Sequence, residues 1–382
     1  MTASSVDAVV GGGLHVRLEG AGEPGARIVR AALGGLPLAT GRPDLVLRVG
    51  RNVRPTGPAW RPLPAGIDTG GLWVTDHLGR AARLPLFAEE PVADCDGAID
   101  ASFLYVWVFL PLVRALLWRQ GIVLVHAAGA VQGAERVAVA GWEGAGKSLV
   151  VLDALAHGSD LIGDDWIAVT PAGNVAAVSG LLNLHAAHAT SVPRGRLGGP
   201  SARVAGAGAR WAHGAAKRTA GFRPASVGLA HLSESLRKAG KVKANVTEIF
   251  PASTVAGPGP LASLAVVVPE GAALPRTPAD AAASLAACSL VEWRHCADLE
   301  ALAAFAGHRP LRAPFPVAAD EEKALARALA GVAITAVRGP LEVPTAQALR
   351  AQLAPPSGDG ARVATGIAPA SREPDVPVRE AV

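Results

Sequence analysis

Eight consecutive residues near the middle of the chain could bind a phosphate group. They fit the phosphate-loop pattern G-x-x-x-x-G-K-[ST] and are, in order, Gly141, Trp142, Glu143, Gly144, Ala145, Gly146, Lys147 and Ser148. Glycines let backbone N–H groups converge on an anion, and the N-terminus of a following helix adds partial positive charge. Lys147 can reach the β- and γ-phosphates of ATP, and the Ser148 hydroxyl can bind Mg²⁺.

The residues around this pattern suit it. A short apolar, β-branched run at residues 137–140 precedes the loop, and an apolar helix-forming run at residues 149–156 follows. We therefore expect a strand, a loop and a helix that together bind a nucleotide. The alternative is a glycine-rich turn that carries Lys-Ser by chance.

Two adjacent carboxylates follow the predicted helix. Asp164 and Asp165 interrupt an apolar, strand-like run at residues 161–169. Neighbouring acids at the end of a strand are costly unless a cation or hydrogen bonds satisfy them. Mg²⁺ prefers oxygen ligands and is the natural partner beside a phosphate loop. The alternative is a solvated turn between two strands.

A histidine ends the strand pattern that comes before the loop. Residues 122–125 are an apolar run typical of a buried strand, and His126 follows it directly. His126 should therefore lie in the same sheet as the strand that leads into the loop. It is either a core histidine with its hydrogen bonds satisfied or part of the site. His15 and His77 stand alone, and we expect both to be solvated.

Composition excludes several classes of protein. Half of the 382 residues are apolar, which argues against wholesale disorder, and a formal net charge of +4 does not by itself indicate a nucleic-acid partner. Cys95, Cys288 and Cys296 are too few and too scattered to predict a disulfide framework or a zinc site. The N-terminus resembles no signal peptide. The apolar run at residues 103–113 is shorter than the ~20 residues of a membrane span, so we expect a soluble, cytoplasmic protein.

The chain divides into three stretches by pattern. Residues 1–100 contain short alternating runs and predict a small, mostly β N-terminal domain. Residues 101–353 mix strand and helix patterns. Within them, residues 194–243 contain 11 Lys or Arg and a single acid, which predicts either a solvated mobile insertion or a lid that faces phosphate or an acidic partner. Residues 354–382 are rich in proline, and we expect them to be disordered.

The order of these signals resembles the catalytic domain of HPr kinase/phosphorylase and the shorter HPr-kinase-related serine kinases of bacteria. The matching positions are His126, residues 141–148, Asp164 and Asp165, and the resemblance spans roughly residues 100–350. It implies an α/β fold of the HPr kinase/PEP carboxykinase type, with a mixed sheet and flanking helices. It also implies ATP and Mg²⁺ as cofactors.

The expected activity is transfer of the γ-phosphoryl group of ATP to a hydroxyl, most simply a serine of a protein or peptide. Lys147 and the loop amides would hold the phosphates, and Ser148 and Asp164 would hold Mg²⁺. Asp165 would accept the hydroxyl proton, although the two acids could exchange roles, and His126 would lie near the γ-phosphate. A homo-oligomer is compatible with this reading.

Two alternatives stay open. A nucleotide-binding regulatory protein without catalysis is favoured by Glu143, whose carboxylate would repel phosphate if it faced the loop. It is also favoured by residues 179–185, which contain no Glu where the resembled kinases carry an acidic signature. A small-molecule kinase would use the same site and differ only in the acceptor.

Overall fold

In the computed structural model of the chain, the described residues are 4–56, 63–69, 71–89, 91–184, 188, 192, 242–305 and 314–353. The predicted tail at residues 354–382 lies outside them. So does the predicted basic insertion, except for Val242 and Lys243 at its end.

The N-terminal part is built on a seven-stranded sheet with the order β1-β2-β3-β7-β6-β5-β4. The pairs β2–β3 and β3–β7 are parallel, and the other neighbours are antiparallel. The alternating runs at residues 14–18 and 45–49 do form strands. The strands are β1 Ser5–Val10, β2 Leu14–Glu19, β3 Leu45–Val49, β4 Ala65–Asp68, β5 Gly71–Thr75, β6 Ala81–Arg83 and β7 Val92–Cys95, with η1 Pro24–Ala26 and α1 Arg27–Leu33 beside them.

The expectation that His15 is solvated is wrong. His15 is buried, and its Nε2 lies 2.7 Å from Asp7 Oδ1 across the β1–β2 pair. Its Nδ1 lies 3.1 Å from the carbonyl oxygen of Arg42. A buried polar ring is tolerated here because both nitrogens have partners. His77 is exposed, as expected.

The apolar segment is one continuous helix, made of α2 Ala101–Leu104, the π-helical turn η2 Tyr105–Phe109 and α3 Leu110–Arg119. Pro111 lies just after the wider turn, where a proline that lacks an N–H is accommodated. At 19 residues the helix is long and apolar enough to cross a membrane, and 72% of its most apolar window is buried in the structure. The apolar helix continues past Arg114, because Arg114 is buried and pairs with Glu321.

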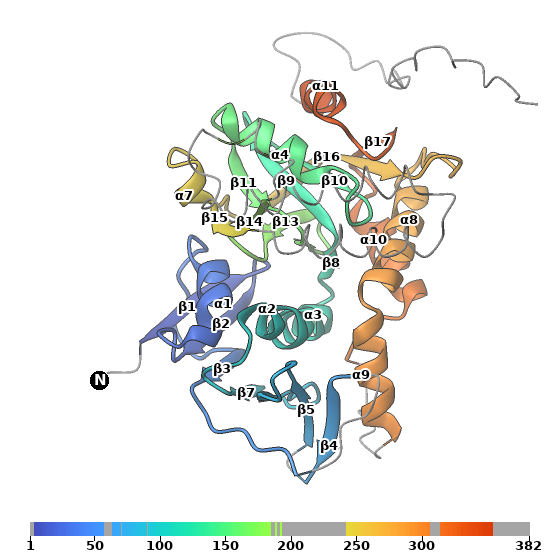
Figure 1. Cartoon of the computed structure of the whole chain (residues 1–382). Helices are drawn as coiled ribbons and strands as arrows, with labels where there is room; N and C mark the ends of the chain where they lie inside the picture. Colours follow the sequence, from blue (N-terminus) through green and yellow to red (C-terminus); the bar gives the residue numbers. More distant parts are fainter. Residues whose placement is uncertain are drawn as a thin grey trace, which may run out of the picture.

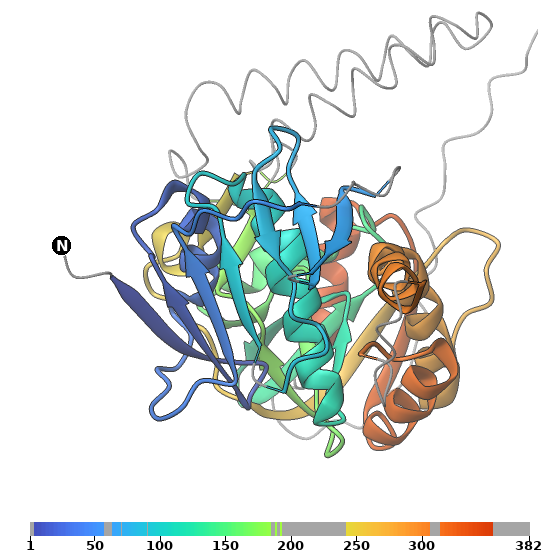
Figure 2. The ribbon, with the colours of Figure 1, turned by 90° about the horizontal axis from the view of Figure 1, so that it is seen from below.

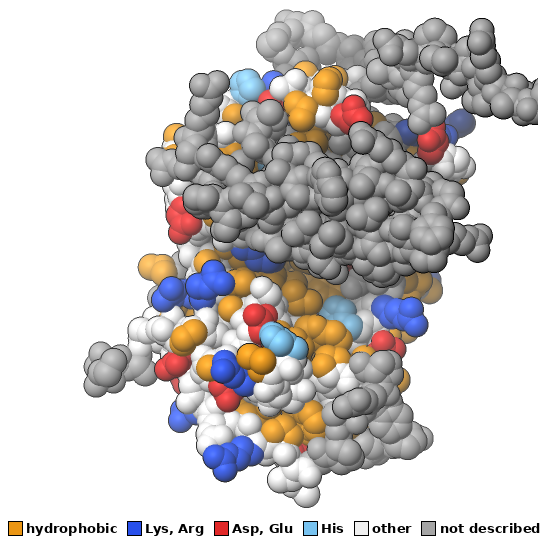
Figure 3. Space-filling view, viewed as in Figure 1, with side chains coloured by type: hydrophobic (Ala, Val, Ile, Leu, Met, Phe, Trp, Pro, Cys, Tyr) orange, Lys and Arg blue, Asp and Glu red, His pale blue; other side chains and the backbone are white. Residues whose placement is uncertain are grey.

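This helix lies between the two sheets (Figures 1 and 2). The hydrophobic cluster around it contains Leu14 and Leu47 from the first sheet, and Leu124 and Ala168 from the second. The cluster therefore runs across residue 100 without a break. On the face drawn in Figure 3, the described Lys and Arg side chains are mixed with acidic and hydrophobic ones.

The second sheet has the order β11-β9-β10-β16-β13-β12-β8, and β17 also pairs with β16. The pairs β10–β16 and β16–β17 are parallel and the others antiparallel, so the chain has an α/β fold with a mixed sheet. The strands are β8 Val123–Val125, β9 Ala127–Gln132, β10 Glu135–Ala140, β11 Asp160–Gly163, β12 Ile167–Val169, β13 Asn174–Ala177, β16 Gly259–Val268 and β17 Ala333–Arg338.

Helices cover both faces of this sheet, as the alternation along β10 requires. Val137 and Val139 pack with α4 Lys147–Ala156 and α11 Val343–Leu353. Ala138 and Ala140 pack in the cluster with α8 Pro278–Glu292 and α10 Ala318–Ala328. Thr277 and Asp280 form a capping box at the start of α8. The other elements in the described part of the chain are β14 Leu181–Leu184, β15 Val242–Asn245, α7 Val246–Ile249 and α9 Arg294–Phe305.

Three chain segments meet at one end of the second sheet. The carboxyl end of β10 leads into α4, His126 joins β8 to β9, and Asp164 and Asp165 join β11 to β12. The C-terminal end of α8 reaches the same place, because Glu292 contacts His126. The topology therefore brings together residues that are far apart in the sequence.

Candidate functional site

The glycine-rich loop (residues 141–146) connects β10 to the first residue of α4. Gly146 has a φ of +88°, and a Cβ atom there would lie 2.6 Å from the carbonyl oxygen of Leu341, so both conformation and space require glycine. Ala145 is buried and Trp142 is half-buried, whereas Glu143 and Gly144 are exposed. The predicted order of strand, loop and helix is therefore observed, and the Glu143 side chain reaches solvent.

Lys147 begins α4, and its side chain is buried beneath the loop. Its Nζ donates to the carbonyl oxygens of Gly141 at 2.8 Å and Trp142 at 2.9 Å, and lies 3.1 Å from His126 Nε2. Burial lowers the pKa of Lys147, and the charges of Asp165 and its neighbours partly oppose that effect. The ammonium group is thus held by carbonyl oxygens of the loop.

Ser148 and Asp164 form the second contact between α4 and the strand region. Ser148 Oγ donates a 2.6 Å hydrogen bond to Asp164 Oδ1. The other carboxylate oxygen, Oδ2, accepts from the backbone N–H of Asn183 at 2.7 Å. Burial raises the pKa of Asp164 to about 6, although both hydrogen bonds favour the ionised form. Two oxygen ligands suitable for Mg²⁺ therefore lie side by side.

Asp165 turns away from its neighbour toward His126. Its φ of +102° places it in a conformation that few residues other than Gly, Asn and Asp adopt. Asp165 Oδ1 lies 3.1 Å from His126 Nε2. Burial would raise the pKa of Asp165, but the hydrogen bond and charge of His126, with Lys243 and Lys147, lower it to about 2. Asp165 is consequently a carboxylate at neutral pH.

His126 is buried and fixed on three sides. Its Nδ1 lies 2.9 Å from Glu292 Oε1, and its ring stacks on Trp166 with centroids 4.9 Å apart. Burial would lower the pKa of His126, but the hydrogen bonds to Asp165, Cys288 and Glu292 raise it to about 10. The imidazole is therefore held in its charged form between two carboxylates.

Glu292 is the residue whose role sequence reasoning missed most clearly. Its Oε1 accepts a 3.2 Å hydrogen bond from the backbone N–H of Glu143, so a carboxylate oxygen lies against the glycine-rich loop. Glu292 is 166 positions from His126, and only the packing of α8 on the second sheet brings it near. No local spacing in the sequence could have indicated it.

Asn183 was also missed. From the sequence, we noted only that residues 179–185 contain no Glu. In the structure, the backbone N–H of Asn183 donates to the Asp164 carboxylate, and the Asn183 side-chain amide donates to the Asp164 carbonyl oxygen at 3.3 Å. The signal that could have found it is a polar residue within the apolar strand β14. Asn183 therefore orients Asp164 toward Ser148.

The predicted site residues come together in space. Lys147, His126 and Asp165 form one contact chain, and Ser148 and Asp164 form a second beside it. Lys147 and His126 place positive charge beside the glycine-rich loop. Ser148 and Asp164 provide oxygen ligands. This arrangement can bind an anionic group together with a divalent cation.

No protein-family model matches the chain, and a search of curated proteins finds no match. The side chains of the site are therefore the basis for any proposal about its ligand.

Proposed function

We propose that the protein is an ATP-dependent kinase that transfers the γ-phosphoryl group to a hydroxyl, with a serine of a protein or peptide as the acceptor. The observation that carries this proposal is the junction of a glycine-rich loop, a buried lysine and a serine–carboxylate pair at the start of one helix. Phosphoryl transfer needs positioning and charge neutralisation more than covalent chemistry, and these groups supply both.

In this proposal the triphosphate lies against residues 141–146 and the N-terminus of α4. Backbone N–H groups and the helix dipole favour an anion there. Lys147 exchanges its hydrogen bonds to the Gly141 and Trp142 carbonyls for phosphate oxygens. Glu292 has to withdraw its Oε1 from the Glu143 N–H, because two anions cannot share that position.

The cation site consists of hard oxygen ligands. Ser148 Oγ and Asp164 Oδ1 are already in contact, and Asn183 holds the carboxylate in place. This donor set fits Mg²⁺, which binds one or two protein oxygens and the phosphates of its substrate. Bound Mg²⁺ would neutralise charge on the β- and γ-phosphates. It would also favour the ionised form of Asp164.

Asp165 is assigned to the acceptor hydroxyl. The serine oxygen forms a bond to the γ-phosphorus while the bond from that phosphorus to the β–γ bridging oxygen breaks, and ADP leaves. The hydroxyl proton passes to Asp165. With a pKa of about 2, Asp165 is ionised and accepts the hydrogen bond of the hydroxyl, and it takes the proton as the oxygen–phosphorus bond forms. His126 stabilises Asp165 in the ionised state that this role requires.

The acceptor would approach from the side on which Lys243 lies. The Lys243 Nζ lies 4.3 Å from the ring centroid of Tyr105, and its charge contributes to the low pKa of Asp165. Lys243 is the last residue of the basic span at 194–243. The positive charge of Lys243 on this side of Asp165 supports an acidic protein or peptide as the acceptor. The same chemistry is compatible with a cytoplasmic enzyme.

A second candidate function is a regulatory protein that binds nucleotide and transfers nothing. The contact between Glu292 Oε1 and the Glu143 N–H favours it, because a carboxylate occupies the place of a phosphate oxygen. In that case nucleotide would displace Glu292 and shift α8, and no acceptor would be needed.

The test is incubation of the purified protein with γ-labelled ATP, Mg²⁺ and a cell extract. We expect label in a protein band with the wild type and none with Asp165→Asn, while the exposed Glu143→Gln serves as a control that keeps activity. Label in a small molecule instead would identify a small-molecule kinase. ATP binding without any transfer would contradict the kinase and favour the regulatory protein.

A further inference from the structure

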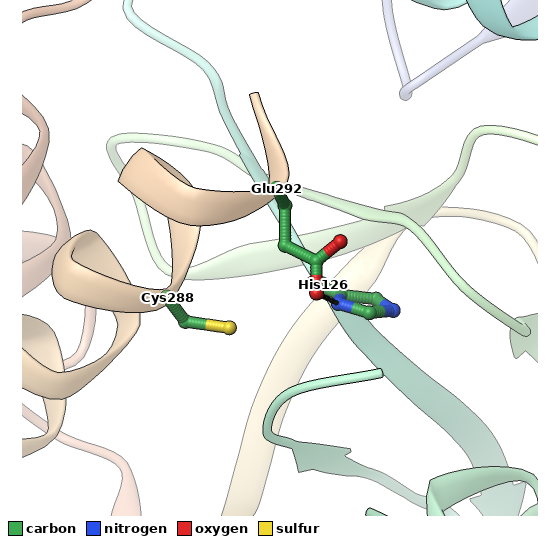
Figure 4. A group of neighbouring side chains, drawn as sticks. All are labelled: His126, Cys288 and Glu292. Carbon is green, nitrogen blue, oxygen red and sulfur yellow. Dashed lines mark hydrogen bonds and ion pairs between the residues drawn. The ribbon is translucent and has the colours of Figure 1, made fainter. Parts of the chain in front are cut away.

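A ring nitrogen, a thiol and a carboxylate converge beside the loop. Cys288 and Glu292 lie four residues apart on α8, so their side chains leave the same face of the helix. Both point toward His126 at the junction of β8 and β9 (Figure 4). The ligand atoms of these three residues all lie within 4.8 Å of one another, and His126 Nδ1 lies 2.9 Å from Glu292 Oε1.

This donor set has a definite chemical preference. Nitrogen, sulfur and oxygen ligands together suit Zn²⁺ and similar transition-metal ions, whereas Mg²⁺ and Ca²⁺ select oxygen. Around one tetrahedral Zn²⁺, bonds of about 2.0–2.3 Å place neighbouring ligand atoms roughly 3.3–3.7 Å apart. The three atoms need only small side-chain adjustments to reach that spacing.

The surroundings of His126 supply an independent observation. A histidine that binds a metal usually donates its other ring N–H to a carboxylate, which fixes the tautomer and the ring orientation. His126 Nε2 lies 3.1 Å from Asp165 Oδ1, which is the carboxylate partner of the nitrogen that faces away from the proposed metal. Trp166 stacks on the ring with an interplanar angle of 25°. Nδ1 is thereby directed toward Cys288 and Glu292.

We propose that His126 Nδ1, Cys288 Sγ and the Glu292 carboxylate bind one transition-metal ion of the Zn²⁺ class. Cys288 binds as a thiolate and His126 Nδ1 as the nitrogen of a neutral imidazole, so the thiol and the charged imidazole of the metal-free protein each release one proton to solvent. The three side chains leave a fourth tetrahedral position for water or an exogenous ligand. Cysteine spacing predicted no zinc site, because the ligands come from residues 126, 288 and 292 and only one of them is a cysteine.

The test uses the full chain, stripped with a chelator and free of nucleotide, so that its outcome does not depend on the proposed kinase activity. Co²⁺ titration reports the ligand set directly, because a bound thiolate gives a charge-transfer absorption band. We expect the wild type to bind one Co²⁺ with this band and to exchange it for Zn²⁺. Cys288→Ser should lose the band, and Glu292→Gln should bind Zn²⁺ at least about 10-fold more weakly.

Two controls protect this result. Cys296→Ser removes a buried thiol elsewhere and should keep the band. Circular dichroism and thermal unfolding without metal establish that each variant is folded.

Asp165→Asn should weaken Zn²⁺ binding by about 10–100-fold, because it removes the partner of the other ring nitrogen. A wild type without the thiolate band, or a Cys288→Ser variant that binds Zn²⁺ as tightly as the wild type, would overturn the proposal.

Discussion

Ser148 Oγ donates a 2.6 Å hydrogen bond to Asp164 Oδ1, which ties the first turn of α4 to the junction of β11 and β12. The serine follows the loop lysine directly, and the aspartate is buried. A hydroxyl and a carboxylate are oxygen ligands of the kind that Mg²⁺ prefers, and the two lie in contact here.

Removal of this hydroxyl should weaken Mg²⁺-dependent nucleotide binding. We expect Ser148→Ala to lower the affinity for Mg·ATP by about 10-fold or more, because one metal ligand is lost while Asp164 remains. The difference should shrink when ATP is titrated with EDTA and no Mg²⁺. Ser284→Ala is the matched control, since the Ser284 hydroxyl donates to the Asp280 carbonyl oxygen within α8. An equal loss with and without Mg²⁺ would argue against a metal ligand.

Asp165→Asn should separate binding from chemistry. Asparagine fits the φ of +102° and keeps a hydrogen-bonding side chain, so the fold should be retained. We expect Mg·ATP binding close to that of the wild type and a fall in phosphoryl transfer of about 10²–10⁴-fold. Calorimetry and single-turnover labelling measure the two quantities. Unchanged transfer would remove Asp165 from the mechanism.

Glu292→Gln should strengthen ATP binding in metal-stripped protein supplied with Mg²⁺. The change removes the negative charge that lies 3.2 Å from the loop N–H of Glu143, while the amide keeps the size of the side chain. An affinity gain on the order of 1 kcal/mol, or about 5-fold, is expected from relief of like-charge repulsion. Glu143→Gln should change little because its side chain is exposed. A gain only in Glu143→Gln would show that the wrong carboxylate has been assigned.

The free energy of unfolding should depend on pH through the buried ion pair of Arg114 and Glu321, which contacts α8. Glu321 accepts from Ser289 at 2.9 Å and lies 3.1 Å from Arg114. Burial raises the pKa of Glu321 above its ordinary value of 4.5, and Arg114 only partly offsets this effect. A group with a raised folded-state pKa contributes stability below its unfolded pKa and loses it as pH rises through the folded value.

From pH 4.5 upward, the wild type should therefore lose unfolding free energy relative to Glu321→Gln. Urea unfolding at several pH values between 4 and 7.5 measures that difference. The exposed neighbour Glu322 provides the control variant, Glu322→Gln. A difference between wild type and Glu321→Gln that stays constant with pH would mean that Glu321 keeps an ordinary pKa.

Local patterns in the sequence predicted the elements that carry the site. The β-branched run before residue 141, the glycines and the apolar run after Ser148 each determine their own structure over a few residues. The start of α8 is likewise set by a local interaction, because Thr277 caps the helix and Pro278 is its first residue. The proximity of His126 to the loop followed from its place beside the strand that leads into it.

Contacts set by tertiary packing could not be predicted in this way. Glu292 reaches the loop only because α8 covers one face of the second sheet. His15 can be buried because Asp7 on the neighbouring strand β1 and the carbonyl oxygen of Arg42 contact its two ring nitrogens. Arg114 is a charged residue that follows an apolar run, yet it is buried because Glu321 from α10 pairs with it inside the fold. In each case the position of a polar side chain depends on a partner that is distant in the sequence.

Isothermal titration of Mg·ATP into wild type and Lys147→Ala tests the central claim most directly. The Lys147 Nζ sits beneath the loop on the carbonyl oxygens of Gly141 and Trp142, where it can move to phosphate oxygens without a change of fold. We expect the wild type to bind one Mg·ATP, and Lys147→Ala, shown to be folded by circular dichroism, to lose most of that affinity. No binding by the wild type, or equal binding by both proteins, would contradict a nucleotide site at residues 141–148.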